Sequence, residues 1–178
     1  MAKITTKQTT VRNVKRAIAV LEVLNSNAVE KYESSVALEE KIGMRIHRIE
    51  YDVSQILMQF GTNGDCVSFG HSFLAVQPAG GFTRVSPGVI DQNRLTRLFA
   101  GGAIDTHFFK SPEIIRDFTD LPGGGILIHP ANFYIWYYTH NAFTTGDYIY
   151  ANVYYSMEDI TQDAWDELWK TMFVTQAG

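Results

Sequence analysis

The sequence predicts an all-β protein of one domain, a sandwich of antiparallel strands that ends in a single helix. Three patterns lead to this fold class. Residues Met44 to Ser54 alternate between two faces, as a half-buried strand does. Two runs rich in aromatic and β-branched residues, Asn132 to His140 and Tyr148 to Met157, follow later in the chain. After Met157 the apolar spacing changes from 2 residues to 3.6, and 178 residues with 46% hydrophobic content are enough for one full core.

The N-terminal end of the chain differs in charge from the rest. The first 16 residues carry no acid and a charge of +5, whereas the remaining 162 residues carry −9, so a basic arm is attached to an acidic body. The basic residues of the arm are Lys3, Lys7, Arg12, Lys15 and Arg16. We assign residues 1–24 to this arm and residues 25–178 to the sandwich with its closing helix. The arm is either a solvated tail or a contact for an anionic polymer or an acidic neighbouring subunit.

The last part of the arm has two interpretations. Val11 to Leu24 spaces its apolar residues as one face of a short helix, and Ala17 to Leu24 fits a strand equally well. Beyond it, strands are expected at Val29 to Leu38, Met44 to Ser54, Val67 to Gln77, Thr106 to Lys110 and Ile114 to Phe118. In the second of these, uninterrupted alternation places His47, Ile49 and Tyr51 on one face.

A Gly- and Pro-containing excursion runs from Pro78 to Gly102. Within it, Asp91 to Ala100 fits a short helix with Asp91 as its N-cap. The turn Asp120 to Gly125 then leads into the aromatic runs, because its Pro-Gly-Gly-Gly sequence favours tight backbone bends.

The two aromatic runs flank a polar connector, Asn141 to Asp147, which predicts a hairpin. Neither face of the first run is polar, so that strand lies in the middle of a sandwich or docks one face on another molecule. The second run has a tyrosine face, which suits a contact surface as well as a core. The candidates for a subunit interface or ligand platform are Tyr134, Trp136, Tyr138, Tyr148, Tyr150 and Tyr154.

The C-terminal segment predicts an amphipathic helix. Its apolar residues recur at helical spacing: Trp165, Leu168, Trp169, Met172 and Phe173. Acidic residues gather toward its start, where the helix dipole favours them, and Thr161 is a suitable N-cap.

No pattern of catalytic residues emerges from the sequence. The five histidines lie on separate expected strands, but no His-x-His pair of a metal-binding barrel is present. There is no Gly-x-Ser-x-Gly elbow and no phosphate-binding glycine loop, and Cys66, the only cysteine, lacks a catalytic context. No apolar run approaches the ~20 residues of a membrane span. We therefore expect a protein that is not an enzyme, with no catalytic residues, metal, cofactor or small-molecule substrate.

The order of elements resembles a known family. The chain is similar in its element order to the single jelly-roll capsid proteins of icosahedral viruses. The shared features are a basic arm, about eight short strands with two long excursions, a Pro- and Gly-rich turn before an aromatic strand, and a short closing helix. The resemblance is strongest to the small capsid proteins of tailless, membrane-containing double-stranded-DNA viruses of bacteria and archaea. It is one of architecture and covers roughly Val29 to Phe173.

This resemblance implies a single jelly-roll β-sandwich of about eight strands that assembles into a viral capsid or shell. The implied partners are copies of the chain and other capsid proteins, and the implied location is the virion, assembled in the host cytoplasm. In such proteins the basic arm faces the interior, toward nucleic acid or membrane. The alternative function is a sandwich that binds a glycan or a receptor through an exposed Trp136 and its tyrosine neighbours. Exposure separates the two, because a sugar platform leaves rings open to solvent whereas a core or subunit contact covers them.

Overall fold

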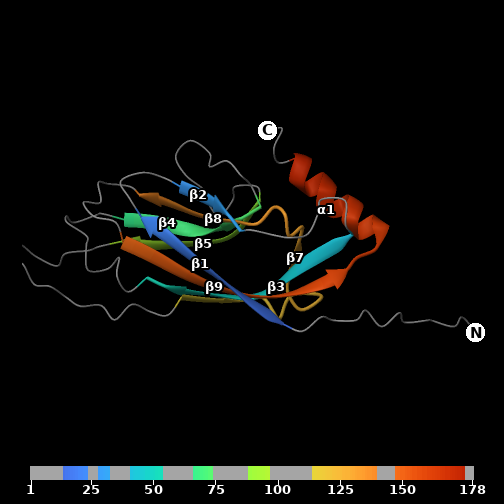
Figure 1. Cartoon of the computed structure of the whole chain (residues 1–178), viewed down its shortest axis with the longest axis horizontal. Helices are drawn as coiled ribbons and strands as arrows, with labels where there is room; N and C mark the ends of the chain where they lie inside the picture. The colour runs from blue at the N-terminus through green and yellow to red at the C-terminus, as the bar shows by residue number, and fades with distance from the viewer. Residues whose placement is uncertain are drawn as a thin grey trace, which may run out of the picture.

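The computed structural model of the chain describes residues 14–23, 28–32, 41–53, 66–73, 88–96, 114–139 and 147–174 (Figure 1). These residues form nine strands and one helix: β1 (Lys15–Val23), β2 (Ala28–Lys31), β3 (Ile42–Asp52), β4 (Cys66–Ser72), β5 (Val89–Thr96), β6 (Ile114–Asp117), β7 (Ile126–Ile128), β8 (Tyr134–Thr139), β9 (Asp147–Asp159) and α1 (Gln162–Val174). The strands make two antiparallel sheets in a sandwich-like arrangement. The predicted all-β class with a closing helix is confirmed.

Each sheet combines strands from both ends of the chain. The first sheet has the order β1-β9-β3-β6, with β7 also paired to β3, and the second has the order β2-β8-β4-β5. Along the sequence, each strand pair encloses the next one. From the outermost to the innermost, the pairs are β1 with β9, β2 with β8, β3 with β6 and β7, and β4 with β5. The further pairs β3 with β9 and β4 with β8 complete the sheets.

The core lies between the two sheets. The first sheet contributes fully buried aliphatic residues, among them Leu21, Val23, Ile46, Ile49, Ile149 and Val153. The second sheet contributes larger rings together with aliphatic residues, among them Val67, Phe69, Phe133, Ile135 and Tyr137. Removal of these side chains from water is the main force that holds the sheets face to face.

The alternation expected for β3 is wrong in its first half. The register of β3 against β9 shifts between Ile46 and Arg48, so His47 is the extra residue of a β-bulge. Before the bulge the buried side chains are Met44 and Ile46, and after it Ile49 begins the buried face. The bulge therefore exchanges the inward and outward faces once along this strand.

The helix expected at Asp91 to Ala100 is also wrong, because Val89–Thr96 is strand β5. Asp91, Asn93 and Leu95 are its buried residues, at the spacing of two that a strand requires. Two of them are polar, and their hydrogen bonds allow them to be buried. The strand expected at Thr106 to Lys110 lies outside the described residues, whereas that expected at Ile114 to Phe118 is confirmed as β6.

The predicted hairpin is wrong as well. β8 pairs with β2 and β4 in the second sheet, and β9 pairs with β1 and β3 in the first. Each of the two strands has an apolar face, and these faces meet across the core instead of the strands pairing edge to edge. The open question over Val11 to Leu24 resolves as a strand, because β1 pairs with β9 along its length. Residues 15–23 thus belong to the first sheet and not to a separate arm.

The closing helix is confirmed as α1, which follows β9 at one end of the sandwich (Figure 1). The Oγ1 atom of Thr161 accepts a hydrogen bond from the backbone N–H of Ala164 at 3.3 Å, so Thr161 caps the helix as expected. The rings of Trp165 and Trp169 stack with their centroids 5.0 Å apart.

Gly70 on β4 is the position where we expect a single methyl group to cost most. A Cβ there would lie 2.0 Å from the carbonyl oxygen of Asp91 and 3.1 Å from Cζ2 of Trp136. Gly70→Ala should therefore lower the free energy of unfolding by about 3 kcal/mol or more, since the β5 backbone would have to move. Urea unfolding followed by circular dichroism measures this. Gly124→Ala is the control, because a Cβ there meets no atom within 4 Å and only the φ of 76° opposes it, at about 1–2 kcal/mol. Equal stability of the two variants would contradict the predicted clash.

Candidate functional site

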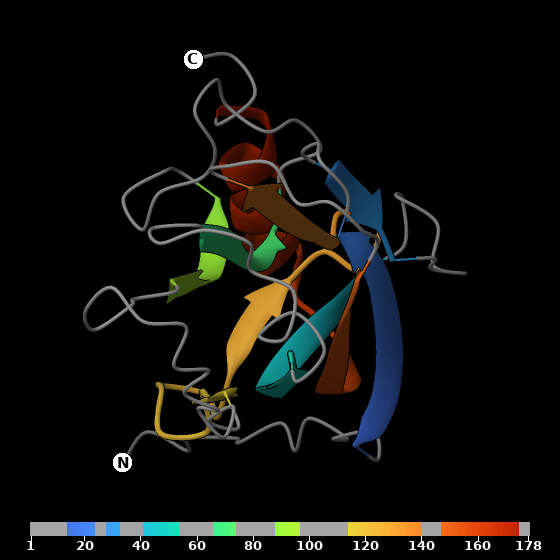
Figure 2. The same cartoon turned by 90° about the vertical axis from the view of Figure 1, so that its left-hand side faces the viewer.

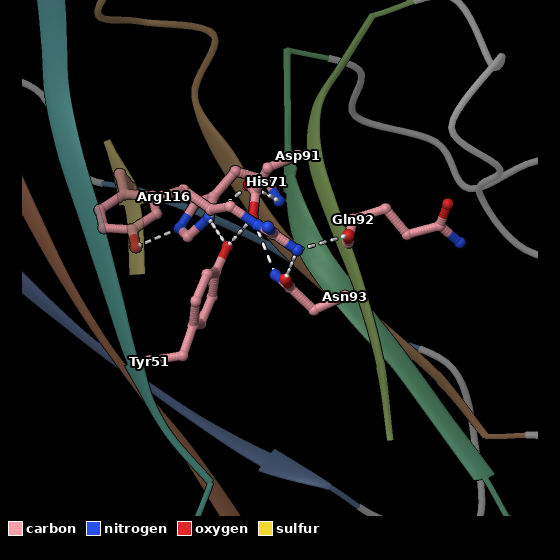
Figure 3. A network of polar contacts seen from close by, with 7 residues as sticks. Tyr51, His71, Asp91, Gln92, Asn93 and Arg116 are labelled. Atoms are coloured by element: carbon pink, nitrogen blue, oxygen red, sulfur yellow. Dashed lines mark hydrogen bonds and ion pairs between the residues drawn. The ribbon is translucent and has the colours of Figure 1, made fainter. Parts of the chain in front are cut away.

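A polar network lies inside the sandwich, around the carboxylate of Asp91 (Figure 3). The Asp91 side chain is only 4% exposed. Its oxygens accept hydrogen bonds from the Tyr51 hydroxyl at 2.6 Å, from the backbone N–H of His71 at 2.9 Å and from Nδ2 of Asn93 at 2.9 Å. A buried carboxylate needs such donors because it has lost its water.

The network continues through His71 to a second tyrosine. Nδ1 of His71 lies 2.5 Å from the Tyr51 hydroxyl, and Nε2 lies 2.8 Å from the hydroxyl of Tyr32. Because Tyr51 gives its only proton to Asp91, Nδ1–H of His71 donates to the Tyr51 hydroxyl oxygen, and Nε2 of the same ring is hydrogen-bonded to the Tyr32 hydroxyl. The imidazole of His71 is also stacked on the ring of Phe133, with centroids 5.0 Å apart.

This network bridges the two sheets. Tyr51 on β3 belongs to the first sheet, whereas His71 on β4 and Asp91 on β5 belong to the second. Arg116 on β6 adds a second bridge, because its NH2 group donates to Oδ1 of Asn93 across the core. The network therefore fixes the position of one sheet relative to the other.

The same burial shifts the ionisation of both tyrosines. Loss of water, reinforced by the negative charge of Asp91, raises the pKa of Tyr51 well above the ordinary value of about 10. The pKa of Tyr32 is raised for the same two reasons, in the same order. His71 is fully buried, so the network lies between the sheets, where it helps to hold the fold together.

The outer face of the first sheet carries most of the exposed large apolar side chains of the described residues. We define it as the side chains that point away from the second sheet. On β1 and β9 these are Arg16, Ile18, Val20, Glu22, Tyr148, Tyr150, Asn152 and Tyr154, which pair across the two strands. On β3 and β6 they are Arg48, Glu50, Asp52, Ile115 and Asp117.

The middle of the outer face is polar and internally paired. Arg48 and Glu50 form an ion pair at 2.5 Å, and the Tyr154 hydroxyl donates to Glu50 at 3.0 Å. Arg16 donates to Oδ1 of Asn152 at 2.7 and 3.0 Å. These contacts pair most of the polar groups within the chain, whereas Nε of Arg48 is buried without a hydrogen-bond partner.

The two edges of the outer face are apolar and exposed. At the β1 edge, Ile18 is 61% exposed and Val20 is 49% exposed, with Val14 beside the start of the strand at 59%. At the β6 edge, Ile115 is 37% exposed, and Leu121 in the following turn is 45% exposed. Exposed β-branched and leucine side chains thus lie at both borders of one sheet.

The arm residues fall into two groups. Lys15 and Arg16 are exposed at the start of β1, at the apolar edge of the outer face. Lys3, Lys7 and Arg12 lie outside the described residues.

The aromatic candidates lie on two different sheets. Tyr148, Tyr150 and Tyr154 lie together on the outer face, where the rings of Tyr148 and Tyr150 are 6.2 Å apart. Tyr134 and Tyr138 are partly buried on β8 of the second sheet, and Trp136 between them is fully buried. The structure therefore does not bring the six residues into one platform, and Trp136 is not the exposed ring that the glycan alternative requires.

Sequence reasoning missed both the polar network and the exposed β1 edge. The signal for the network was the polar, strand-like spacing of Asp91 and Asn93 before Leu95, which we interpreted as a helix cap. The signal for the edge was the pair Ile18 and Val20. Because Ala17 and Ala19 are apolar as well, the sequence shows no alternation of apolar and polar residues there.

A second polar cluster holds the glycine turn against the first sheet. The ring of His47, the bulge residue, lies 2.7 Å from the carbonyl oxygen of Gly124 and 2.8 Å from Oγ of the buried Ser156. Arg45 pairs with Glu158 beside it.

In the part of the chain that the structure describes, no group of three or more histidine, cysteine or acidic side chains is arranged to hold a metal. In the same ranges, no helix combines the length and hydropathy of a membrane span.

No protein-family model and no curated protein matches this sequence.

Removal of the Tyr51 hydroxyl should weaken the network in a pH-dependent way. Tyr51→Phe leaves Asp91 and His71 each without one partner, which should lower the free energy of unfolding near pH 7 by about 1–3 kcal/mol. A raised tyrosine pKa stabilises the fold fully below pH ~10, and that stability is lost as the pH rises above it. The wild-type protein should thus lose stability between pH ~8 and pH ~11, and the variant should lose less.

Urea midpoints at the two pH values measure both effects. Tyr148→Phe is the matched control, because it removes a tyrosine hydroxyl outside the network and should keep the wild-type response to pH. An unchanged alkaline loss in Tyr51→Phe would show that this hydroxyl is not the group responsible.

Proposed function

We propose that this protein is a non-enzymatic structural subunit that assembles with copies of itself into a viral capsid or related shell. The observation that carries the proposal is the outer face of the first sheet, with exposed apolar residues at both of its edges. A subunit of a closed shell contacts several neighbours and so needs more than one contact area. Ile18 at one edge and Ile115 at the other offer two such areas on the same sheet.

We further propose that the sandwich is a single jelly roll. The nested strand pairs support this, since a jelly roll is a long antiparallel hairpin wrapped so that its pairs distribute over two sheets. If β6 and β7, which both pair with β3, count as one interrupted strand, the sandwich has eight strand positions. This topology is common to viral capsid and lectin domains, so the contact areas, and not the fold, favour assembly.

The proposal also gives the basic arm a role. Two of its residues, Lys15 and Arg16, begin β1 at an edge of the outer face. In the assembled virion this arm would contact nucleic acid, membrane or the acidic body of a neighbouring subunit, held by charge. Other capsid proteins are further candidate partners.

Light scattering after size-exclusion chromatography tests assembly. The wild-type protein should form species larger than a dimer, with a mass that grows with concentration. The double variants Ile18→Lys/Val20→Lys and Ile115→Lys/Leu121→Lys should each give smaller species, because each places charge in one contact area, and their combination should give monomers. The four side chains are exposed, so each substitution should change the free energy of unfolding by less than about 0.5 kcal/mol.

Gln162→Lys is the matched control, because it adds a positive charge on the exposed start of α1, outside both contact areas, and should assemble like the wild-type protein. Circular dichroism confirms that each variant is folded. A wild-type protein that stays monomeric at high concentration would overturn the proposal. Binding of the monomer to a glycan array or receptor would instead favour the alternative function.

A further inference from the structure

We infer that β1 pairs with β1 of a second copy, antiparallel and centred on Ala19, so that the first sheets of two subunits join into one continuous sheet. This inference rests on the proposed function and specifies one of its contacts. It is drawn from the edge position of β1 and from the sequence of its outward side chains.

In the part of the chain that the structure describes, no second strand covers the free edge of β1. Among the described strands, β1 pairs only with β9, and Figure 2 shows it, in blue, as the outermost strand. Its nine residues pair with β9 without a bulge and contain no proline. Proteins usually block such an edge with a bulge, a proline or a charge in mid-strand, since unpaired N–H and C=O groups attract another strand. Here the middle of the strand carries Ile18, Ala19 and Val20 instead.

The register follows from matching side chains. With Ala19 opposite its own copy, Ile18 lies opposite the partner's Val20, and Arg16 lies opposite the partner's Glu22. Both relations occur twice because the pairing is two-fold symmetric. Directly opposed residues share a face, so all four pairs lie on the outer face, with apolar residues in the centre and opposite charges at the ends.

Neighbouring symmetric registers lose this match. Centring the pair on Ile18 would place Arg16 opposite the partner's Val20. Centring it on Val20 would place Ile18 opposite the partner's Glu22. On the outer face, both place a charge against an apolar side chain, whereas the register on Ala19 does not. The register on Ala19 has one such pair on the inner face, Lys15 opposite the partner's Val23, at the ends of the paired strands. Charge complementarity of the strand with itself therefore selects a second copy of this chain as the occupant.

Charge reversal tests the pairing in the otherwise wild-type protein. R16E or E22R places like charges opposite each other at both ends, and each should weaken association about tenfold. The double variant R16E/E22R restores opposite charges and should recover most of the wild-type affinity. N152A is the control, because it removes the contact of Arg16 within its own chain and leaves its charge. Failure of the double variant to recover would overturn the register.

Disulfide trapping tests the geometry independently. In a Cys66→Ala background, I18C and V20C are made as separate proteins and oxidised alone or as a mixture. Opposed residues have Cα atoms about 4.5–5.5 Å apart, within disulfide reach, whereas Ile18 and the partner's Ile18 would be diagonal at about 7–8 Å. The mixture should therefore cross-link at least about five times more than either protein alone.

The outcomes separate this inference from the proposed function. Strong cross-linking only in the mixture supports β1 pairing. Particles or oligomers by light scattering without selective cross-linking would overturn β1 pairing and leave assembly standing. A monomer under all conditions would overturn both.

Discussion

The burial of the Asp91 carboxylate is the constraint on which the sandwich depends. An ionised carboxylate loses several kcal/mol of hydration on burial unless donors replace the water. Here the donors come from both layers, because Tyr51 belongs to the first sheet and His71 to the second. Apolar packing alone would tolerate small slips of one sheet over the other, but directional hydrogen bonds do not. The polar network thus sets a unique alignment at the corner where β3 and β6 face β4 and β5.

The position of the first sheet, and with it the outer face, depends on that alignment. The network and Arg116 tie the β6 side of the first sheet to the second sheet, while the β1 side is held by its pairing with β9 and by apolar residues such as Leu21 and Val23. Most of the polar groups in the middle of the outer face are paired within the chain. What remains open is at the borders, where Ile18 and Ile115 are exposed. The exposed aliphatic side chains of this sheet therefore lie at its edges.

The sequence predicted elements wherever one face alone was apolar. The tyrosine face of β9 and the capped helix α1 could be derived because period and capping residues agree there. Asp91 could not, since a buried carboxylate in a strand makes sense only once Tyr51 and His71, distant in sequence, are near it. The bulge at His47 depends on the partner strand in the same way. The hairpin was mistaken because neighbours in sequence were assumed to be neighbours in the sheet.

The position of β9 between β1 and β3 has a consequence for synthesis on the ribosome. The first strand and the third emerge early, but the strand that joins them is the last to be made. Until it leaves the exit tunnel, the sheet that carries the outer face has no centre, and its contacts have a high sequence separation that slows folding. A nascent chain consequently cannot complete the outer face before β9 has emerged, so this surface is among the last parts of the fold to form.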